Sequence, residues 1–438
     1  MHGLDALPID QGLLRSFEAF YEQPFSVAHR PIKFSKSASF SENAVAHAAA
    51  DAGELSIAGA FGKHPNPVPS IGDHPDFLHL KGTDDVCYCP ITTMFMDIES
   101  STRLSLLYPL EDVRRIKNAF IQTAIQIMRC FEGHVHRIMG DAVMAYFGGP
   151  GAKVEDTIIN GINCAAILRH FAAKVVVQKL KAEGYDHDFG IRIGLDHGPH
   201  QQVLWSSYGF PGMDEVTATS YYVDVASKLQ HAAGRNHAML GQSLIETIDL
   251  PTELTFVKTS TKNGVQVEDG IVMPNLTNGL GQSINYRQRQ LAGDDYLLCT
   301  RVGQQFHGNG LRTFGVRPLD LQCTVHSEKG GAIEGVYYPA SKVLPKKKYL
   351  RFTFNTPYVP SLPYTVACIV ENHGSEAASA DPKARGNHTE FYTVQSLEQH
   401  LAFCHWEHTA YRGLHYMTVE IREDGRRTFV SRFGVYVE

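Results

Sequence analysis

Apolar residues follow three spacings along the chain, and these spacings divide it into regions. Residues 1–86 contain one short stretch with helical spacing, from Leu13 to Tyr21, followed by Ser-, Ala- and Pro-rich segments. From residue 87 to about 250, short apolar runs alternate with longer stretches in which apolar residues recur every three or four positions. After residue 346, several runs have apolar residues at every second position. The pattern predicts an N-terminal extension (1–86, partly irregular), a mixed domain and a β-domain.

The middle region predicts a definite order of elements. The apolar run from Met94 is expected to be a buried strand that stops at Asp97. The next helix carries Val113, Ile116 and Phe120 on one side. A hairpin over 133–148, a helix over 155–176, a strand over 189–195 paired with 202–205, and helices over 220–233 and 243–248 follow. Residues 294–302 are expected to add a last strand. This order predicts an α+β fold whose mixed sheet carries its helices on one face.

The C-terminal region shows the alternation of antiparallel strands. Leu350, Phe352 and Phe354 alternate with polar residues, and the same pattern covers residues 417–421 and 429–437. Asp424 and Gly425 lie between the last two runs, where an Asp-Gly pair favours a tight hairpin turn. We expect an all-β, sandwich-like domain over 346–438, with one buried and one solvent-facing side per sheet, after a linker over 306–345.

Composition and charge exclude several classes of protein. The chain has 40 Lys and Arg against 46 Asp and Glu, a net charge of −6, whereas broad nucleic-acid binding needs a basic surface. No apolar run reaches the roughly 18 residues of a membrane-spanning helix. The eight cysteines are scattered, which is typical of reduced thiols. We therefore expect a cytoplasmic protein that binds neither nucleic acid nor membrane.

Two carboxylates stand out because each lies beside a turn at the end of an apolar run. Asp97 precedes a Ser/Ser/Thr helix start at residues 100–102, where backbone N–H groups lack partners. Asp141 follows Gly140 at the expected hairpin tip. Carboxylates on adjacent strands beside a helix N-terminus suit two divalent cations on a nucleoside triphosphate. Taken singly, Asp97 is equally explained as a helix N-cap and Asp141 as a turn residue.

Four segments, in the right order, resemble the catalytic domain of class III nucleotidyl cyclases. They are residues 97–102, 137–148, 191–198 and 223–229, and the resemblance covers about residues 90–250. It implies a ferredoxin-like βαββαβ catalytic domain, expected over 87–305, that cyclises a nucleoside triphosphate with two divalent cations, Mn²⁺ or Mg²⁺. It also implies a head-to-tail homodimer in which both chains build each active site.

The resemblance also implies a role for each matching position. Asp97 and Asp141 would hold the cations with the Ile98 carbonyl, and Arg192 would meet the phosphates. The partner chain would bring its base, ribose and phosphate contacts to the same site. The implied set comprises the cation ligands Asp97, Asp141 and Ile98, the further catalytic residues Asp224 (ribose) and Lys228 (phosphates), and the substrate contacts Ser100, Ser101, Thr102, Arg192, Arg137 (base) and Thr217 (base).

The residue at position 137 bears on the choice of base. Adenylate cyclases have Lys there and guanylate cyclases Glu, whereas Arg137 only donates hydrogen bonds and suits a base edge that accepts. Uracil presents two carbonyl acceptors, cytosine and adenine each present an amino donor, and guanine O6 and N7 also accept. Thr217, in place of Asp, also points away from adenine. The expected substrate is UTP, yielding 3′,5′-cyclic UMP, with CTP as the alternative.

Other positions keep different interpretations open. Asp224 and Lys228 replace the Asn and Arg usual in the family, so a non-catalytic nucleotide-binding protein is the alternative from another class. Lys228 is equally explained as a solvated helix residue. For Arg137, an edge-strand arginine at the surface is the second interpretation, after the base contact.

The C-terminal region carries a second resemblance. Residues 370–377, 384–386 and 407–415 resemble the sensor domain found after some bacterial cyclases and second-messenger nucleotidyltransferases. Glu407, Arg385, Arg412 and His415 in these segments form either a ligand site or polar networks that hold the loops. A class III cyclase joined to such a domain resembles the Pycsar-type pyrimidine cyclases. That resemblance implies a second messenger for bacterial anti-phage defence, which acts on a separately encoded effector.

Overall fold

The chain forms two compact units. The computed structural model describes residues 8–22, 49, 51–63, 65, 71–186, 189–262, 265–273, 276–305, 316–381 and 383–438. Unit 1 comprises Met1–Leu244 and Val257–Leu291, and unit 2 comprises Ile245–Phe256 and Ala292–Glu438. Residues 292–305, which we expected to end the catalytic domain, therefore belong to unit 2.

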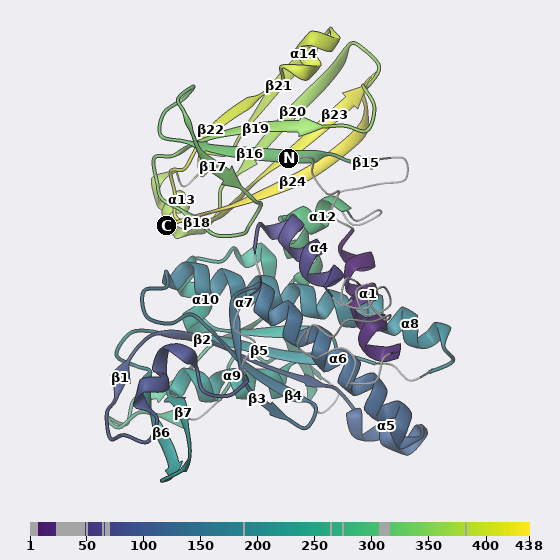
Figure 1. The fold of residues 1–438 in the computed structure, drawn as a ribbon. Helices are drawn as coiled ribbons and strands as arrows, with labels where there is room; N and C mark the ends of the chain where they lie inside the picture. Colours follow the sequence, from purple (N-terminus) through teal and green to yellow (C-terminus); the bar gives the residue numbers. More distant parts are fainter. Residues whose placement is uncertain are drawn as a thin grey trace, which may run out of the picture. The chain divides into compact units, whose positions relative to one another are not determined.

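The central sheet of unit 1, in which Figure 1 labels β2, β3, β4 and β5, includes the strand order β3-β4-β2-β5-β8-β14. Neighbouring strands are antiparallel except β5 and β8, which are parallel. The first four strands have the ferredoxin-like order, so the fold class that the resemblance implied is confirmed. The strands are β2 (Ile91–Ile98), β3 (Gly133–Met139), β4 (Ala142–Phe147), β5 (Ile191–Gly198), β8 (His237–Gly241) and β14 (Gln288–Leu291).

Helices cover both faces of this sheet, so the expectation of helices on one face is wrong. A Cβ on Gly161 of α7 (Val154–His170) would lie 3.0 Å from the Leu195 side chain. A Cβ on Gly194 would lie 2.3 Å from the Ala226 carbonyl oxygen of α9 (Tyr221–Ala232). Because neighbouring residues of a strand face opposite sides, α7 and α9 pack on opposite faces of β5. Gly194 allows α9 to approach closely.

A second, smaller sheet replaces the hairpin expected between residues 189–195 and 202–205. Its order is β1-β6-β7, with β1 at Cys87–Tyr88, β6 at Leu204–Phe210 and β7 at Met213–Thr219. Trp205 of β6 stacks on Phe77 with ring centroids 3.9 Å apart and meets Tyr146 of β4 edge-on. Burying this indole against the main sheet places β6 in a separate layer rather than beside β5.

The N-terminal helix expected around residues 13–21 is present as α1 (Ile9–Glu22), and a second helix, α4 (Ala52–Phe61), was not predicted. The apolar residues of α4 are not concentrated on one face, so the sequence carries little helical periodicity. Ser16 of α1 accepts a hydrogen bond of 2.9 Å from the Gly53 N–H. The remaining elements of unit 1 include η1 (Pro75–Leu80), α5 (Ser101–Leu107), α6 (Leu110–Cys130), the π-helical η2 (Phe171–Val176), α8 (Val177–Ala182), β10 (Thr259–Lys262), β11 (Val265–Glu268), β12 (Leu276–Thr277) and β13 (Ser283–Ile284).

A buried carboxyl group ties β5 to its neighbours. Asp196 is fully buried and accepts hydrogen bonds from the Tyr286 hydroxyl (2.7 Å), the His197 N–H (2.9 Å) and the Leu244 N–H (3.4 Å). Burial raises the pKa of Asp196 to about 7, although these hydrogen bonds lower it. Gly241 lies opposite this carboxyl group. A Cβ there would lie 2.2 Å from the Asp196 carboxyl carbon, so the position has no room for a side chain.

We expect Asp196 to make the stability of the fold depend on pH. Its pKa in the folded chain, about 7, exceeds the value of about 4 in an unfolded chain, so the folded state retains the proton longer. Its contribution to stability is complete below pH ~4 and is lost as pH rises towards 7. Thermal unfolding of wild type and Asp196→Asn is measured from pH 4.5 to 8. The unfolding temperature of the variant should rise relative to that of wild type as pH rises. Parallel curves would contradict this assignment.

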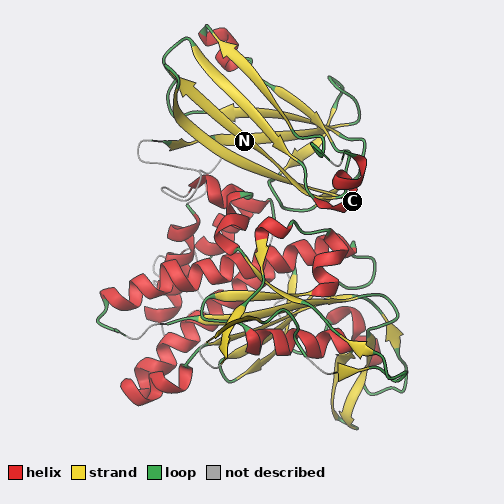
Figure 2. Cartoon of the chain, turned by 180° about the vertical axis from the view of Figure 1, so that it is seen from behind, coloured by secondary structure: helices red, strands yellow, loops and turns green. Residues whose placement is uncertain are grey.

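Unit 2 is a β-sandwich, which confirms the all-β prediction for the C-terminal region (Figure 2). One sheet has the order β15-β24-β23-β20-β21, with β18 also on β24, and the other has the order β17-β16-β19-β22. Side chains from both sheets form one core. The strands are β15 (Arg317–Pro318), β16 (Asp320–His326), β17 (Ile333–Tyr337), β18 (Val343–Leu344), β19 (Tyr349–Asn355), β20 (Tyr364–Glu371), β21 (His388–Val394), β22 (His405–His408), β23 (Gly413–Glu423) and β24 (Arg426–Val437).

Two expectations for unit 2 differ from the structure. Residues 294–302 do not form a strand, because α11 (Gly293–Leu298) and α12 (Arg301–Gln305) occupy the segment. The segment expected to be a linker, 306–345, contains β15 to β18 where it is described. Leu321, Cys323 and Val325 of β16 alternate into the core, as in any half-buried strand.

Candidate active site

The first acidic candidate is held by an arginine from the neighbouring strand. Asp97 is the last residue but one of β2 and lies opposite Arg192 of β5. Arg192 donates from Nε to Asp97 Oδ1 (3.1 Å) and from Nη2 to Oδ2 (2.5 Å). This hydrogen bonding and the charges of Glu99 and Asp141 raise the pKa of Arg192. Arg192, expected to meet phosphates, instead neutralises Asp97 here.

The second acidic candidate lies at the tip of the β3–β4 hairpin, where we expected it. Gly140 takes a left-handed conformation (φ +69°) that allows the tight turn, and Asp141 follows immediately before β4. The next residue, Ala142, is the register partner of Asp97. The two carboxylates therefore lie at the same end of two adjacent strands. Both act electrostatically on Arg192.

The expected strand-to-helix turn follows Asp97 directly. β2 ends at Ile98, whose side chain is buried, and α5 begins at Ser101. Ser100 takes a left-handed conformation (φ 57°), and Thr102 lies in the first turn of α5. The hydroxyl residues thus stand beside Asp97 at the start of a helix, as the sequence indicated.

The base-reading candidates form a separate group. Arg137 of β3 donates from Nε to Glu215 Oε2 of β7 (2.8 Å), and its Nη2 contacts the other Glu215 oxygen. The Arg137 and Glu215 side chains are 42% and 36% exposed, so a ligand can reach the pair. Thr217 lies two residues further along β7 and its hydroxyl is 3.4 Å from the Tyr146 hydroxyl. The sequence interpretation missed Glu215, although an acid two residues before Thr217 on a strand shares its face.

The last two candidates lie on one exposed side of α9. Asp224 and Lys228 are one helical turn apart and both are exposed. Neither makes a side-chain hydrogen bond or ion pair within the described part of the chain. Ser220 caps the helix by accepting from the Tyr222 N–H (3.3 Å). These two side chains are thus available to a second molecule.

Most of the candidates thus form two groups within one chain. Asp97, Asp141 and Arg192 are the acidic group, and Arg137, Glu215 and Thr217 are the base group, whereas Asp224 and Lys228 belong to neither. Across the described residues, no hydrogen bond or ion pair joins the groups. Each group alone lacks the other's chemistry, because the first can neutralise phosphates and hold cations whereas the second can recognise a base.

Comparison with known proteins gives the family. The family model described as "Adenylyl/Guanylyl and SMODS C-terminal sensor domain" matches residues 313–438. The chain is 35% identical over 370 residues to a cytidylate cyclase of Staphylococcus aureus, covering 84% of this chain and 83% of that one. It is 36% identical over 381 residues to a cytidylate cyclase of Escherichia coli, covering 84% and 78%. The chain belongs to the Pycsar-type class III nucleotidyl cyclases.

This nucleotidyl cyclase is also similar to solved structures of other cyclases. An adenylyl cyclase of P. aeruginosa, CyaB, is 18% identical and covers 47% of this chain and 95% of its own, with a TM-score of 0.38. A guanylate cyclase domain from Catenaria anguillulae, solved with GTP, is 16% identical and covers 47% and 97%, with a TM-score of 0.35. Among the described helices, none has the length and apolar character needed to cross a bilayer.

The sensor-domain candidates of this cyclase serve mainly the polar networks of unit 2. The Arg412 guanidinium donates to the Thr247 carbonyl, and its backbone N–H donates to Glu376 (2.6 Å). His415 Nε2 lies 2.7 Å from the Tyr411 carbonyl oxygen, and its Nδ1 accepts from a backbone N–H. Arg385 lies in a left-handed conformation in a turn. Glu407 and His415 also border a cavity in unit 2.

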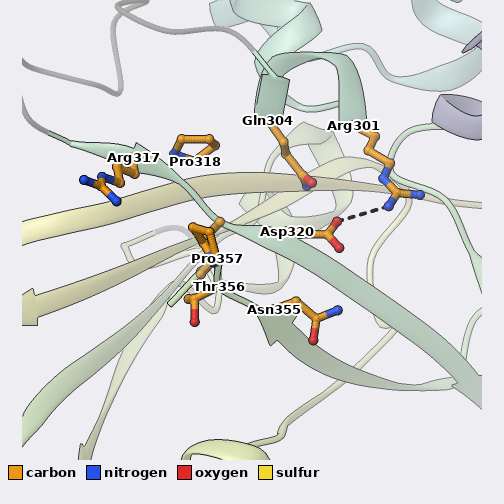
Figure 3. A pocket seen from close by; sticks show the side chains of 9 residues that line it. Arg301, Gln304, Arg317, Pro318, Asp320, Asn355, Thr356 and Pro357 are labelled. Atoms are coloured by element: carbon orange, nitrogen blue, oxygen red, sulfur yellow. Dashed lines mark hydrogen bonds and ion pairs between the residues drawn. The ribbon is translucent and has the colours of Figure 1, made fainter. Parts of the chain in front are cut away.

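Unit 2 also contains an open pocket of about 620 Å³ beside β15 and β16 (Figure 3). Arg301 donates to Asp320 (3.2 Å) across one side of it. Gln304 points toward the same pocket in Figure 3, and within the described chain neither polar atom of its buried amide has a hydrogen-bond partner. An amide buried in this way costs stability unless water or another molecule satisfies it.

Proposed function

We propose that this nucleotidyl cyclase converts CTP into 3′,5′-cyclic CMP and pyrophosphate. The observation that carries the proposal is the ion pair between Arg137 and Glu215. Relatives that share about a third of its residues are named cytidylate cyclases, which supports the same choice.

The ion pair matches the hydrogen-bonding edge of cytosine. Glu215 supplies an acceptor for the cytosine amino group, a contact that carboxylates make with this base. A guanidinium has five N–H groups, so Arg137 retains donors for the ring nitrogen and carbonyl oxygen of cytosine after pairing with Glu215. Acceptor and donors then stand side by side in the order that complements cytosine.

UTP remains the second candidate, and its case depends on Arg137 acting alone. Without a neighbouring acceptor, Arg137 would favour the two carbonyl oxygens of uracil. With Glu215 in place, uracil O4, which stands where cytosine has its amino group, would face a carboxylate. Two acceptors repel each other. This contact therefore favours CTP over UTP.

The acidic group fits a pair of divalent cations. Asp97, Asp141 and the Ile98 carbonyl are hard oxygen ligands suited to Mg²⁺ or Mn²⁺. In the described chain, no cluster of three or more His, Cys, Asp or Glu side chains could hold a metal without help, so substrate phosphates would complete the coordination. When bound, the cations would lower the pKa of the ribose 3′-hydroxyl and neutralise the triphosphate. Arg192 would release Asp97 and turn its donors to the phosphates.

The two separate groups lead us to propose a head-to-tail homodimer with shared sites. One chain would contribute Asp97, Asp141 and Arg192. Its partner would contribute Arg137, Glu215 and Thr217 to the base, Asp224 to the ribose and Lys228 to the phosphates. A symmetric pair places each group twice, so the dimer has two equal sites.

Mixed dimers test this arrangement. Chains with Asp141→Asn and chains with Lys228→Ala should each be inactive when purified alone. Co-expressed with different affinity tags, they should recover about a quarter of wild-type activity, because half of the dimers are mixed and each has one intact site. A mixture as inactive as its components would contradict shared sites.

The substrate itself is tested with purified chain, Mn²⁺ and each of the four nucleoside triphosphates. Cyclic CMP should be the main product, identified by chromatography and mass spectrometry. A preference for UTP would refute the proposed role of Glu215 while leaving the cyclase intact, and no cyclic product from any triphosphate would refute catalysis. In keeping with the Pycsar resemblance, we propose that the product acts in the cytoplasm as an anti-phage second messenger on a separately encoded effector.

A further inference from the structure

Unit 2 encloses a small cavity between its two sheets. Its volume is about 280 Å³, below the range of about 300–1,000 Å³ usual for drug-sized ligands. The inner lining is apolar, with Leu350 and Phe352 from one sheet and Met417 and Val435 from the other. Tyr411 also lines the cavity. Such a lining suits a small ligand with a flat apolar surface.

One carboxylate at this cavity has an unused oxygen. Glu407 Oε1 lies 2.7 Å from His405 Nε2 and 2.9 Å from His388 Nε2. Glu407 Oε2 has no hydrogen-bond partner among the described residues, and the side chain is 17% exposed. His405 is completely buried, so Oε1 is held in place while Oε2 remains available to accept a hydrogen bond.

Two histidines hold Glu407 in its carboxylate form. Burial would raise the pKa of Glu407, but hydrogen bonds from His405 and His388 lower it, so the group is a carboxylate at neutral pH. Both nitrogens of His388 face acceptors, since Nδ1 lies 3.0 Å from the Gly386 carbonyl oxygen. Although burial lowers the pKa of His388, these contacts raise it overall. The hydrogen bond between His388 and Glu407 therefore favours the charged form of each group.

The lining excludes strongly anionic ligands. No Lys or Arg side chain is among the residues that border the cavity, all of which lie in the described chain. A phosphate group would thus lie next to the Glu407 carboxylate with no Lys or Arg side chain to pair with. Several polar side chains border the cavity, including that of Tyr411. Among them, Glu407 Oε2 is an acceptor without a hydrogen-bond partner in the described chain, and it requires a donor on the ligand.

We propose that this cavity binds an uncharged, flat heterocycle with an amino or ring N–H group, of the size of a nucleobase or nucleoside, with Glu407 Oε2 as the acceptor. The apolar inner lining contacts the ring, and the Glu407–His388 pair determines its orientation. The site lies wholly within unit 2 and does not depend on the substrate of the cyclase.

The proposal is tested by calorimetry on the full chain with cytidine, uridine, adenosine and guanosine, and with their 5′-monophosphates. At least one nucleoside should bind, and its monophosphate should bind less tightly. Glu407→Gln should weaken nucleoside binding by at least about tenfold, because a charged acceptor is replaced by an amide of equal size. The matched control is Glu334→Gln. It alters an ion pair between Glu334 of β17 and Lys348, and this variant should bind the nucleoside as wild type does.

Hydrogen–deuterium exchange on the wild-type chain locates the site without any substitution. Protection by the nucleoside should appear in residues 388–394 and 405–417. Protection confined to unit 1 would assign binding to the cyclase site and overturn the proposal. It would equally be overturned if none of the four nucleosides binds at millimolar concentration, or if Glu407→Gln and Glu334→Gln bind alike.

Discussion

Asp141→Asn is expected to lower the rate of cyclic-nucleotide formation by at least a factor of about 100 to 1,000. The substitution keeps the size of the side chain, and Asn tolerates the turn after Gly140 as well as Asp does. It removes one of the two negative charges at the end of β2 and the start of β4. Asp97 alone, paired with Arg192, would not hold two cations. Product formation from CTP and Mn²⁺, measured by chromatography, checks the loss.

Asp424→Asn is the matched control for this variant. Asp424 also stands at a hairpin tip beside a glycine, Gly425, but in unit 2 and far along the chain from the acidic group. This variant should retain wild-type activity, and both variants should unfold at nearly the wild-type temperature. If Asp141→Asn and Asp424→Asn were equally active, Asp141 would be an ordinary turn residue.

Glu215→Ala is expected to change the preference for the base. Removing the carboxylate leaves Arg137 as a donor without an adjacent acceptor, which suits uracil better than cytosine. The ratio of kcat/KM for CTP to that for UTP should fall by about 10- to 100-fold, the range for losing one good base contact. The ion pair is partly exposed, so the fold should lose little stability.

Steady-state kinetics with both triphosphates measures this ratio. Glu268→Ala, on the exposed strand β11, is the control because it removes a glutamate from unit 1 at a distance along the chain from the base group. If Glu215→Ala stays active and its ratio of kcat/KM for CTP to that for UTP is unchanged, Glu215 does not contact the base.

Local patterns in the sequence were sufficient for the elements that carry the acidic group. An apolar run ending at Asp97 and a Gly140-Asp141 pair between two apolar runs each depend on neighbours within about ten residues, so strand, turn and hairpin could be predicted. The α+β class and the C-terminal sandwich followed from spacing in the same way. The prediction of a strand over 294–302 is wrong, because a short apolar run does not distinguish a strand from a buried helix.

Contacts between distant segments were decided only by the tertiary structure. Arg137 and Glu215 are separated by 78 positions, and their pairing depends on β6 and β7 packing as a second layer through Trp205. The same holds for Asp97 with Arg192, 95 positions apart, and for the cavity beside Glu407. The sequence by itself determined the order of elements in the catalytic domain and the places of Asp97, Asp141 and Arg137 on them, because these follow from local spacing, and the motifs indicated the family. The acceptor beside Arg137 and the unused oxygen of Glu407 depend on which strands meet, which no local pattern specifies.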